Sequence, residues 1–204
     1  MVGIYFSGTG NSRYAAEMFC NEYDEAAKAF SIEDDNAIDA VKNDEMLVFA
    51  YPMQYSTVPK ILRDLIIENR ELWKNKKVFV ITTMGLFSGD GAGILGRLLQ
   101  QYGAEIIGGL HLKMPDSIGD EKVLKRPLEK NKELVKRAEQ KISKAVQFLK
   151  SGKPTQEGIG ILYRMAGSFG QRLYFGHKTK NYSDKLRVDE DKCIGAASVK
   201  RYVP

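Results

Sequence analysis

The sequence has little cysteine and no long apolar segment. Two cysteines, Cys20 and Cys193, occur among 204 residues. This excludes a disulfide framework and argues against a cysteine-rich metal or iron–sulfur site. No apolar run approaches the roughly 18 residues that a membrane helix requires, and Met1-Val2-Gly3 offers no basic start to a secretory signal. We therefore expect a cytoplasmic protein with no membrane partner.

A dominant charge of one sign is also lacking, although the formal net charge is +5. Residues 1–112 carry 10 Lys+Arg against 15 Asp+Glu, whereas residues 113–204 carry 21 against 11. A uniformly basic nucleic-acid binder would not begin acidic, and the basic half has no nucleic-acid recognition motif. We expect no nucleic-acid partner. The basic residues at 122–150 are interpreted as a solvated helix face, with an acidic docking partner as the alternative.

Short apolar runs alternate with segments of helical periodicity along the first 150 residues. The runs predict strands at 2–6, 27–32, 46–51, 78–81 and 106–112. Helices are predicted from residue 11, at 60–72, at 93–102, and in a long basic segment whose apolar stripe is Leu124, Leu128, Val135, Ile142 and Leu149. Strands that alternate with helices in this way predict an α/β fold with a doubly wound parallel sheet.

The long helix is expected to end at the turn sequence Ser151-Gly152-Lys153-Pro154. Beyond it, Ile159, Leu162, Met165, Phe169 and Leu173 continue at helical spacing. We therefore expect an appended helix over 151–185 that docks on the first domain or on a partner.

The sequence Ser7-Gly8-Thr9-Gly10-Asn11-Ser12 lies where the first predicted strand meets the first predicted helix. Glycines permit a tight turn there, and the free N–H groups at a helix start favour an anion. A dinucleotide fingerprint would need a glycine at Arg13, and a Walker A loop would need Gly-Lys-Ser/Thr. The simplest alternative is a helix cap, but the position at the carboxyl end of a strand favours a phosphate ligand.

The segment from Phe6 to Ser12 resembles the FMN-phosphate loop of flavodoxins, and more narrowly that of flavodoxin–ferredoxin fusion proteins. Residues 51–59, 82–85 and 113–116 after the later strands, with Gly89, Gly91 and Gly93, also resemble this family. The resemblance implies a five-stranded flavodoxin-like sheet of order 2-1-3-4-5, a C-terminal helical extension, and FMN as cofactor.

By the same resemblance, loops after three strands would hold the FMN. The implied residues are Ser7, Gly8, Thr9, Gly10, Asn11, Ser12, Pro52, Met53, Gln54, Tyr55, Ser56, Thr83, Met84, Gly85 and Phe87. Packing in the core or at the surface is the alternative for the aromatic and thioether side chains, and it is preferred for Tyr51. Trp73 is expected to be structural. We expect no catalytic residue and no metal ligand, since His111 and His177 lack partners at ligand spacing, and we expect Cys20 to be a small buried hydrophobe.

Residues 188–195 resemble the lead-in to a bacterial-type ferredoxin motif with Cys-x2-Cys-x2-Cys-x3-Cys-Pro spacing. Cys193 and Pro204 occupy motif positions, but Ala196, Val199 and Val203 stand where cysteines are due. Restoring one base after Gly195 can convert the tail to Cys-Gly-Lys-Cys-Glu-Glu-Ile-Cys-Pro. We hypothesise a frameshifted, truncated remnant of a [4Fe-4S] module that binds no iron–sulfur cluster. Ordinary divergence is the alternative.

The resemblance thus implies three parts: a flavodoxin-like FMN-binding domain at 1–150, a linker or docking helix at 151–187, and the ferredoxin remnant at 188–204. The implied function is electron transfer with a redox protein partner, and in intact relatives a relay between FMN and iron–sulfur clusters. The alternatives are an NAD(P)H-dependent FMN reductase of quinone-reducing type, and an interaction module whose loop binds another phosphate ligand or none.

Overall fold

The computed structural model describes residues 1–54, 57–87, 89–116 and 125–166, and within these ranges five strands form one sheet. The strands are β1 Val2–Tyr5, β2 Ala29–Ser31, β3 Met46–Pro52, β4 Lys77–Met84 and β5 Glu105–Lys113. Their order is β2-β1-β3-β4-β5, and every neighbouring pair is parallel. The predicted α/β class and the predicted strand order are confirmed.

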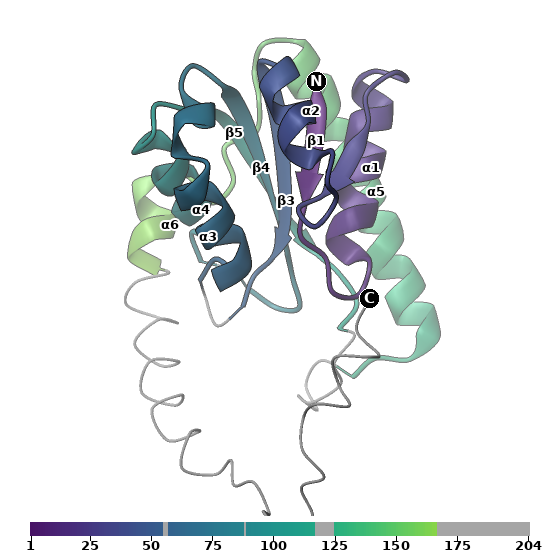
Figure 1. Cartoon of the computed structure of the whole chain (residues 1–204). Helices are drawn as coiled ribbons and strands as arrows, with labels where there is room; N and C mark the ends of the chain where they lie inside the picture. Colours follow the sequence, from purple (N-terminus) through teal and green to yellow (C-terminus); the bar gives the residue numbers. More distant parts are fainter. Residues whose placement is uncertain (55–56, 88, 117–124, 167–204) are drawn as a thin grey trace, which may run out of the picture.

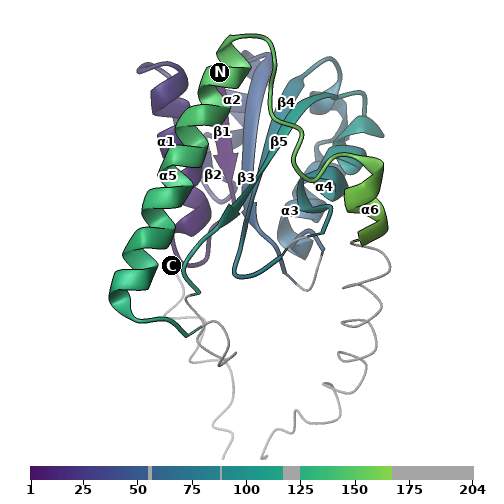
Figure 2. The same ribbon diagram turned by 180° about the vertical axis from the view of Figure 1, so that it is seen from behind.

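Helices cover both faces of the sheet (Figures 1 and 2). They are α1 Asn11–Tyr23, α2 Ala37–Asn43, α3 Lys60–Glu68, α4 Gly91–Gln100, α5 Leu128–Lys150 and α6 Ile161–Ala166, with a 3-10 turn η1 at Arg70–Trp73. The core residues of α1 and α5 pack on one face, and those of α2, α3 and α4 pack on the other. Within the described ranges, no helix combines the length and the apolar character needed to cross a membrane.

The central strands are apolar because both of their faces are covered. In β3, Leu47, Phe49 and Tyr51 face the α3 and α4 side, whereas Val48 and Ala50 face α1 and α5. This alternation is what a strand of period two requires when each face has its own core. The hydrophobic contacts of these two cores fix the sheet between its helical layers.

Two side chains that the sequence analysis assigned to structure are buried as expected. Trp73 is fully buried, its indole Nε1–H donates to the Ile66 carbonyl at 2.8 Å, and its ring lies 5.7 Å from that of Phe49. Cys20 is buried among α1 core residues, and this burial raises the pKa of its thiol to about 12. Both expectations are confirmed.

The helix boundaries correct several expectations. Helix α2 was not predicted, and the predicted helix 60–72 is divided into α3 and η1. Helix α5 begins at Leu128, whose side chain is 69% exposed and therefore does not join the buried stripe. Leu124 lies outside the described residues.

The predicted helix over 151–185 is wrong for its first ten residues. Gly152 and Gly158 have φ values of 74° and 79°, which interrupt a right-handed helix, and α6 begins only at Ile161. Leu162 and Met165, assigned to its apolar stripe, are exposed among the described residues. Residues from 167 onward, including Phe169, Leu173, His177 and Cys193, lie outside the described ranges.

Residues 154–160 form an edge strap, a non-helical segment along the outer edge of β5. The Gly109 N–H donates to the Thr155 carbonyl at 2.8 Å, and the Glu157 N–H donates to the Gly109 carbonyl at 3.0 Å. The Gln156 side chain adds a bond to the Ile107 carbonyl at 2.9 Å. The strap therefore satisfies backbone groups that an edge strand would otherwise leave unpaired.

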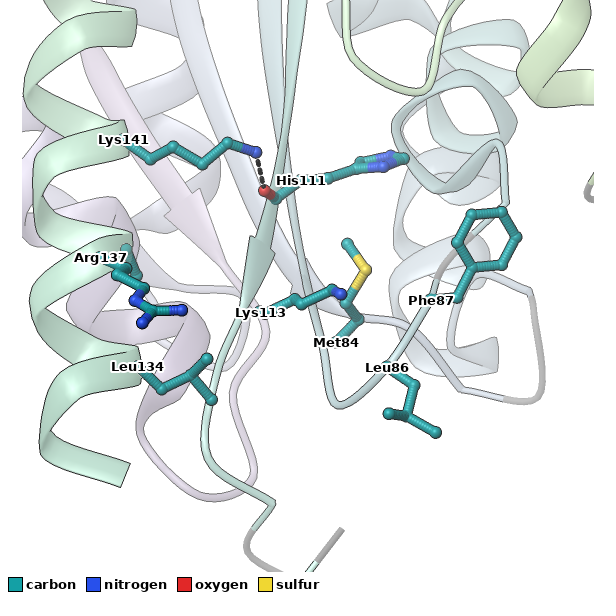
Figure 3. A pocket seen from close by; sticks show the side chains of 9 residues that line it. Met84, Leu86, Phe87, His111, Lys113, Leu134, Arg137 and Lys141 are labelled. Atoms are coloured by element: carbon teal, nitrogen blue, oxygen red, sulfur yellow. Dashed lines mark hydrogen bonds between the residues drawn. The ribbon is translucent and has the colours of Figure 1, made fainter. Parts of the chain in front are cut away.

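A charged network fastens the strap to β5 and α5. The Glu157 carboxylate accepts from the His111 N–H at 2.9 Å and from Lys141 Nζ at 2.6 Å. Lys141 also donates to the His111 carbonyl at 2.8 Å (Figure 3). The His111 ring accepts a long bond, 3.4 Å, from the Ala92 N–H and lies edge-on to Tyr163. These contacts give His111 a structural role between β5, α4 and the strap.

The close approach of the strap makes Gly109 intolerant of a side chain. An added Cβ would lie 2.5 Å from the Glu157 carbonyl oxygen and 3.0 Å from Ala92 Cβ. We expect Gly109→Ala to lower the free energy of unfolding by about 1–3 kcal/mol, because the overpacked strap must shift. Urea unfolding measures this loss. Gly160→Ala is the matched control, since its Cβ would have no neighbour closer than 3.9 Å. Equal losses in the two variants would contradict the prediction.

Burial gives His111 a pH-dependent effect on stability. Burial lowers the pKa of His111 from 6.5 to about 4, with Glu157 opposing and Lys141 reinforcing the shift. Between these values the unfolded chain binds a proton that the folded ring does not bind. The free energy of unfolding should therefore fall as the pH drops from about 6.5 to 4, by at most about 1.4 kcal/mol per pH unit.

Chemical denaturation of the native chain and of His111→Gln across this pH window measures the effect. Carboxylates titrate in both proteins, so the difference between the two curves isolates the imidazole. The native chain should lose more stability than the variant as the pH falls. Parallel curves would show that His111 is not held neutral.

Candidate functional site

The loop between β1 and α1 presents a helix start without a side-chain cap. Gly10 has a φ of 93°, a left-handed conformation that favours glycine, and its N–H donates to Ser7 Oγ at 3.1 Å. Helix α1 begins at Asn11 with no side-chain hydrogen bond to its cap among the described residues and no acidic residue in its first turn. The N–H groups of that turn are therefore placed to bind an anion.

Hydrogen bonds join this loop to those that follow β3, β4 and β5. Ser12 and Thr83 are buried, and their hydroxyl oxygens lie 2.8 Å apart. The Asn11 side-chain amide donates to the Pro115 carbonyl at 2.9 Å. The Met53 N–H donates to the Thr83 carbonyl at 2.9 Å. Four loops are thus held in one arrangement at the carboxyl edge of the sheet.

These loops enclose a cleft of about 190 Å³. Its described lining contains hydroxyl groups, backbone and side-chain amides and three thioethers, and Asp116 is its acidic residue. None of the described lining residues is basic. An anion in this cleft would therefore be held by N–H and O–H donors at the start of α1.

Most of the predicted flavin residues line this cleft. They are Ser7, Gly8, Thr9, Asn11, Ser12, Pro52, Met53, Gln54, Thr83, Met84 and Gly85. Gly10 is not among the lining residues, but its left-handed backbone makes the turn. Tyr55 and Ser56 lie outside the described residues. Tyr51 belongs to β3, where it is fully buried and donates from its hydroxyl to the Gly91 carbonyl at 2.6 Å.

Phe87 lies elsewhere. It lines a second cavity of about 340 Å³ between the β4–α4 loop, β5 and α5, and Met84 lines both cavities (Figure 3). The Phe87 side chain is 48% exposed. Its assignment to the flavin loops was implied by the family resemblance, which does not specify the direction of a side chain.

Three lining residues were absent from the predicted set: Met114, Pro115 and Asp116. They follow β5 directly, and the segment 113–116 had been included in the family resemblance. The position of these residues at the carboxyl end of a parallel strand was the signal that could have placed them. Among the described residues, no cluster of three or more His, Cys, Asp or Glu side chains could hold a metal ion.

Solved flavodoxins share this arrangement of strands and helices. The two-electron reduced flavodoxin of Megasphaera elsdenii is 24% identical, with a TM-score of 0.50 over 69% of this chain and 99% of that one. Oxidised flavodoxin 2 of Bacillus cereus is 16% identical, with a TM-score of 0.53 over 74% and 97%. The flavodoxin of Fusobacterium nucleatum bound to flavin mononucleotide is 14% identical, with a TM-score of 0.51 over 74% and 96%.

No protein-family model and no curated protein matches the chain. At these identities the structural likeness concerns the fold. The parallel order β2-β1-β3-β4-β5, with helices on both faces, is common to the chain and to these proteins. The chain therefore has a flavodoxin-like fold.

Proposed function

We propose that the chain binds flavin mononucleotide in the cleft and acts as an electron-transfer protein of flavodoxin type with a redox protein partner. The observation that carries the proposal is the uncapped start of α1, which is joined by hydrogen bonds to the loops after β4 and β5. Flavodoxins of this fold were solved with FMN bound and in both oxidised and two-electron reduced states. These states are consistent with a carrier.

The donor set fits a phosphate monoester. The first-turn N–H groups of α1 and the hydroxyls of Ser7 and Thr9 would bind its oxygens, since helix starts favour anions. Ser12 has a different task, because its buried hydroxyl is engaged with Thr83. That contact fixes the start of α1 against the end of β4, so the donors are positioned before a ligand arrives.

The rest of the ligand would lie toward the loops after β3 and β4. Met53 and Met84 offer polarisable thioethers from these two loops, and a flat aromatic ring packs well against such groups. Bound FMN supplies the chemistry, which is the uptake and release of electrons. The cleft is smaller than the roughly 300–1,000 Å³ that encloses a drug-sized ligand. Part of the ligand would therefore remain accessible to a partner.

Titration of the protein with FMN, followed by flavin fluorescence, tests the proposal. Ser7→Ala and Thr9→Val should each weaken FMN binding by about ten- to a hundredfold, because a hydrogen bond to a charged group contributes about 1.5–3 kcal/mol. Riboflavin lacks the phosphate, so its affinity should be the same in the variants and the native chain. Ser151→Ala, at the far end of α5, is the control for loss of a hydroxyl. Absence of saturable binding would defeat the proposal.

Turnover assays separate a carrier from a reductase. A carrier with bound FMN should exchange electrons with ferredoxin or flavodoxin partners and show no steady-state oxidation of NADH or NADPH. Sustained oxidation of either nucleotide with a quinone acceptor would favour the reductase instead.

We also propose the division into a flavodoxin-like domain at 1–150, a docking segment at 151–187 and a ferredoxin-motif remnant at 188–204. The bonds of the edge strap to β5 support docking for the first part of 151–187. In relatives with all four cysteines, electrons would pass between FMN and iron–sulfur clusters. The proposed shift of the reading frame accounts for Ala196, Val199 and Val203 together.

The coding DNA tests this origin. Codons 196–204 should yield the cysteine motif when one base is restored after the codon for Gly195. Codons that cannot yield cysteine at all three positions would show that the tail diverged by ordinary substitution.

A further inference from the structure

The second cavity, which we name the edge pocket, lies between the β4–α4 loop, β5 and α5 (Figure 3). Its apolar wall includes Met84, Leu86, Phe87 and Leu134, and its cationic groups include those of Lys113 and Arg137. Its volume of about 340 Å³ falls within the range of small-molecule sites. None of the described residues that line it is acidic.

The charges of the edge pocket are only partly neutralised. Lys141 is fully engaged, since it donates to both the Glu157 carboxylate and the His111 carbonyl. Among the residues that the structure describes, Arg137 pairs only with Glu133, loosely at 3.8 Å on the exposed surface of α5. Lys113 has no ion pair with any residue that the structure describes. The edge pocket therefore carries an excess of positive charge beside an apolar wall.

The backbone of β5 adds a further polar group. Gly109 and His111 direct their N–H and C=O groups to the outer edge, where the strap and Lys141 bind them. The residues that alternate with them direct their backbone groups toward β4, as the bond from the Met114 N–H to the Met84 carbonyl shows. By this alternation the Lys113 backbone groups face the outer edge, beyond the pairing of residues 155–157 with β5.

Exposure of the apolar wall is the other distinguishing feature. Leu86 and Phe87 are each 48% exposed, although they stand side by side in one loop. A ligand with an apolar body would cover them, and its charged end would pair with Lys113 and Arg137. Neutral polar molecules would gain no ion pair with Lys113 or Arg137, so the charge pattern favours an anionic ligand over them.

We propose that the edge pocket is a binding site for a small aromatic carboxylate. Its ring system packs against Leu86, Phe87 and Leu134, and its carboxylate pairs with the Lys113 and Arg137 side chains. Because the site is separate from the phosphate-binding loop, the proposal stands whether or not the cleft binds FMN.

NMR titration of the full-length chain without flavin, using 2-naphthoate as the probe, tests this site. We expect saturable shifts of the backbone amides of Phe87 and Lys113. Lys113→Met and Arg137→Gln should each weaken binding roughly fivefold, as expected for partly exposed ion pairs. The neutral analogue 2-naphthalenemethanol lacks the carboxylate. Its affinity for the native chain should be no higher than the affinity of either variant for 2-naphthoate.

Lys136→Met is the matched control. Lys136 is an exposed lysine of α5, the helix that carries Arg137, but Lys136 does not line the edge pocket. Its affinity for 2-naphthoate should stay within about twofold of the native value. The substituted side chains are exposed, so thermal melting should show that all three variants fold. Absence of saturable shifts, unchanged affinity in both pocket variants, or equal affinity for the neutral analogue would overturn the proposal.

Discussion

The parallel direction of the strands is the constraint on which both cavities depend. Each parallel connection must cross over the sheet, so the chain leaves every strand at the same edge. Because β2 lies on one side of β1 and β3 on the other, successive crossovers diverge beside β1. A crevice opens at that point. The loop after β1 and the loops after β3 and β4 therefore meet there as a consequence of strand order.

The same constraint leaves β5 with an unpaired outer edge. The strap binds Gly109 and His111, then its Gly158 carbonyl accepts from the Gly93 N–H at the start of α4. This contact turns the strap away from β5 and toward the helix. The carboxyl end of the strand, including Lys113, is left as a wall of the edge pocket. A need for backbone hydrogen bonds thus determines both how far the strap extends and where the second cavity begins.

Features of the fold with a local signal were predictable from the sequence, and those that depend on distant partners were not. Buried strands such as 46–51 show as continuous apolar runs, and the helix start at Asn11 shows as a cluster of Ser, Thr, Gly and Asn. Helix α2 has seven residues and two buried positions, Ala37 and Val41, too few to establish a period. The strap has no periodic pattern, and its side-chain bonds to β5 join residues 46 to 49 positions apart.

The residues of the candidate site also divide into those that the sequence predicts and those that depend on distant contacts. Most of the cleft residues could be assigned from loop sequences that resemble those of the flavodoxin family. The direction of the Phe87 side chain could not be assigned from the sequence, because it depends on how the β4–α4 loop packs beside β5 and α5. The hydrogen bond from the Asn11 side chain to the Pro115 carbonyl joins residues 104 positions apart. A single sequence contains no measure of that contact.

The two cavities are suited to anions by different physical means. In the cleft, neutral donors at the start of α1 are fixed by buried contacts such as the one between Ser12 and Thr83. Such donors are directional, and their dipolar charges act within the first turn of the helix, close to the ligand. In the edge pocket, full charges are carried by flexible, exposed side chains, whose attraction is weakened by ions within about 10 Å at ordinary salt concentrations.

This contrast assigns different selectivities to the two sites. A preorganised ring of N–H and O–H donors discriminates by the geometry of the anion, which suits a phosphate with three equivalent oxygens. Exposed cations discriminate by net charge and proximity, so their selectivity depends on the apolar body that brings the anion close to them. In the edge pocket that body would contact Leu86 and Phe87. Hydrophobic contact there supplies the specificity that exposed charges alone do not.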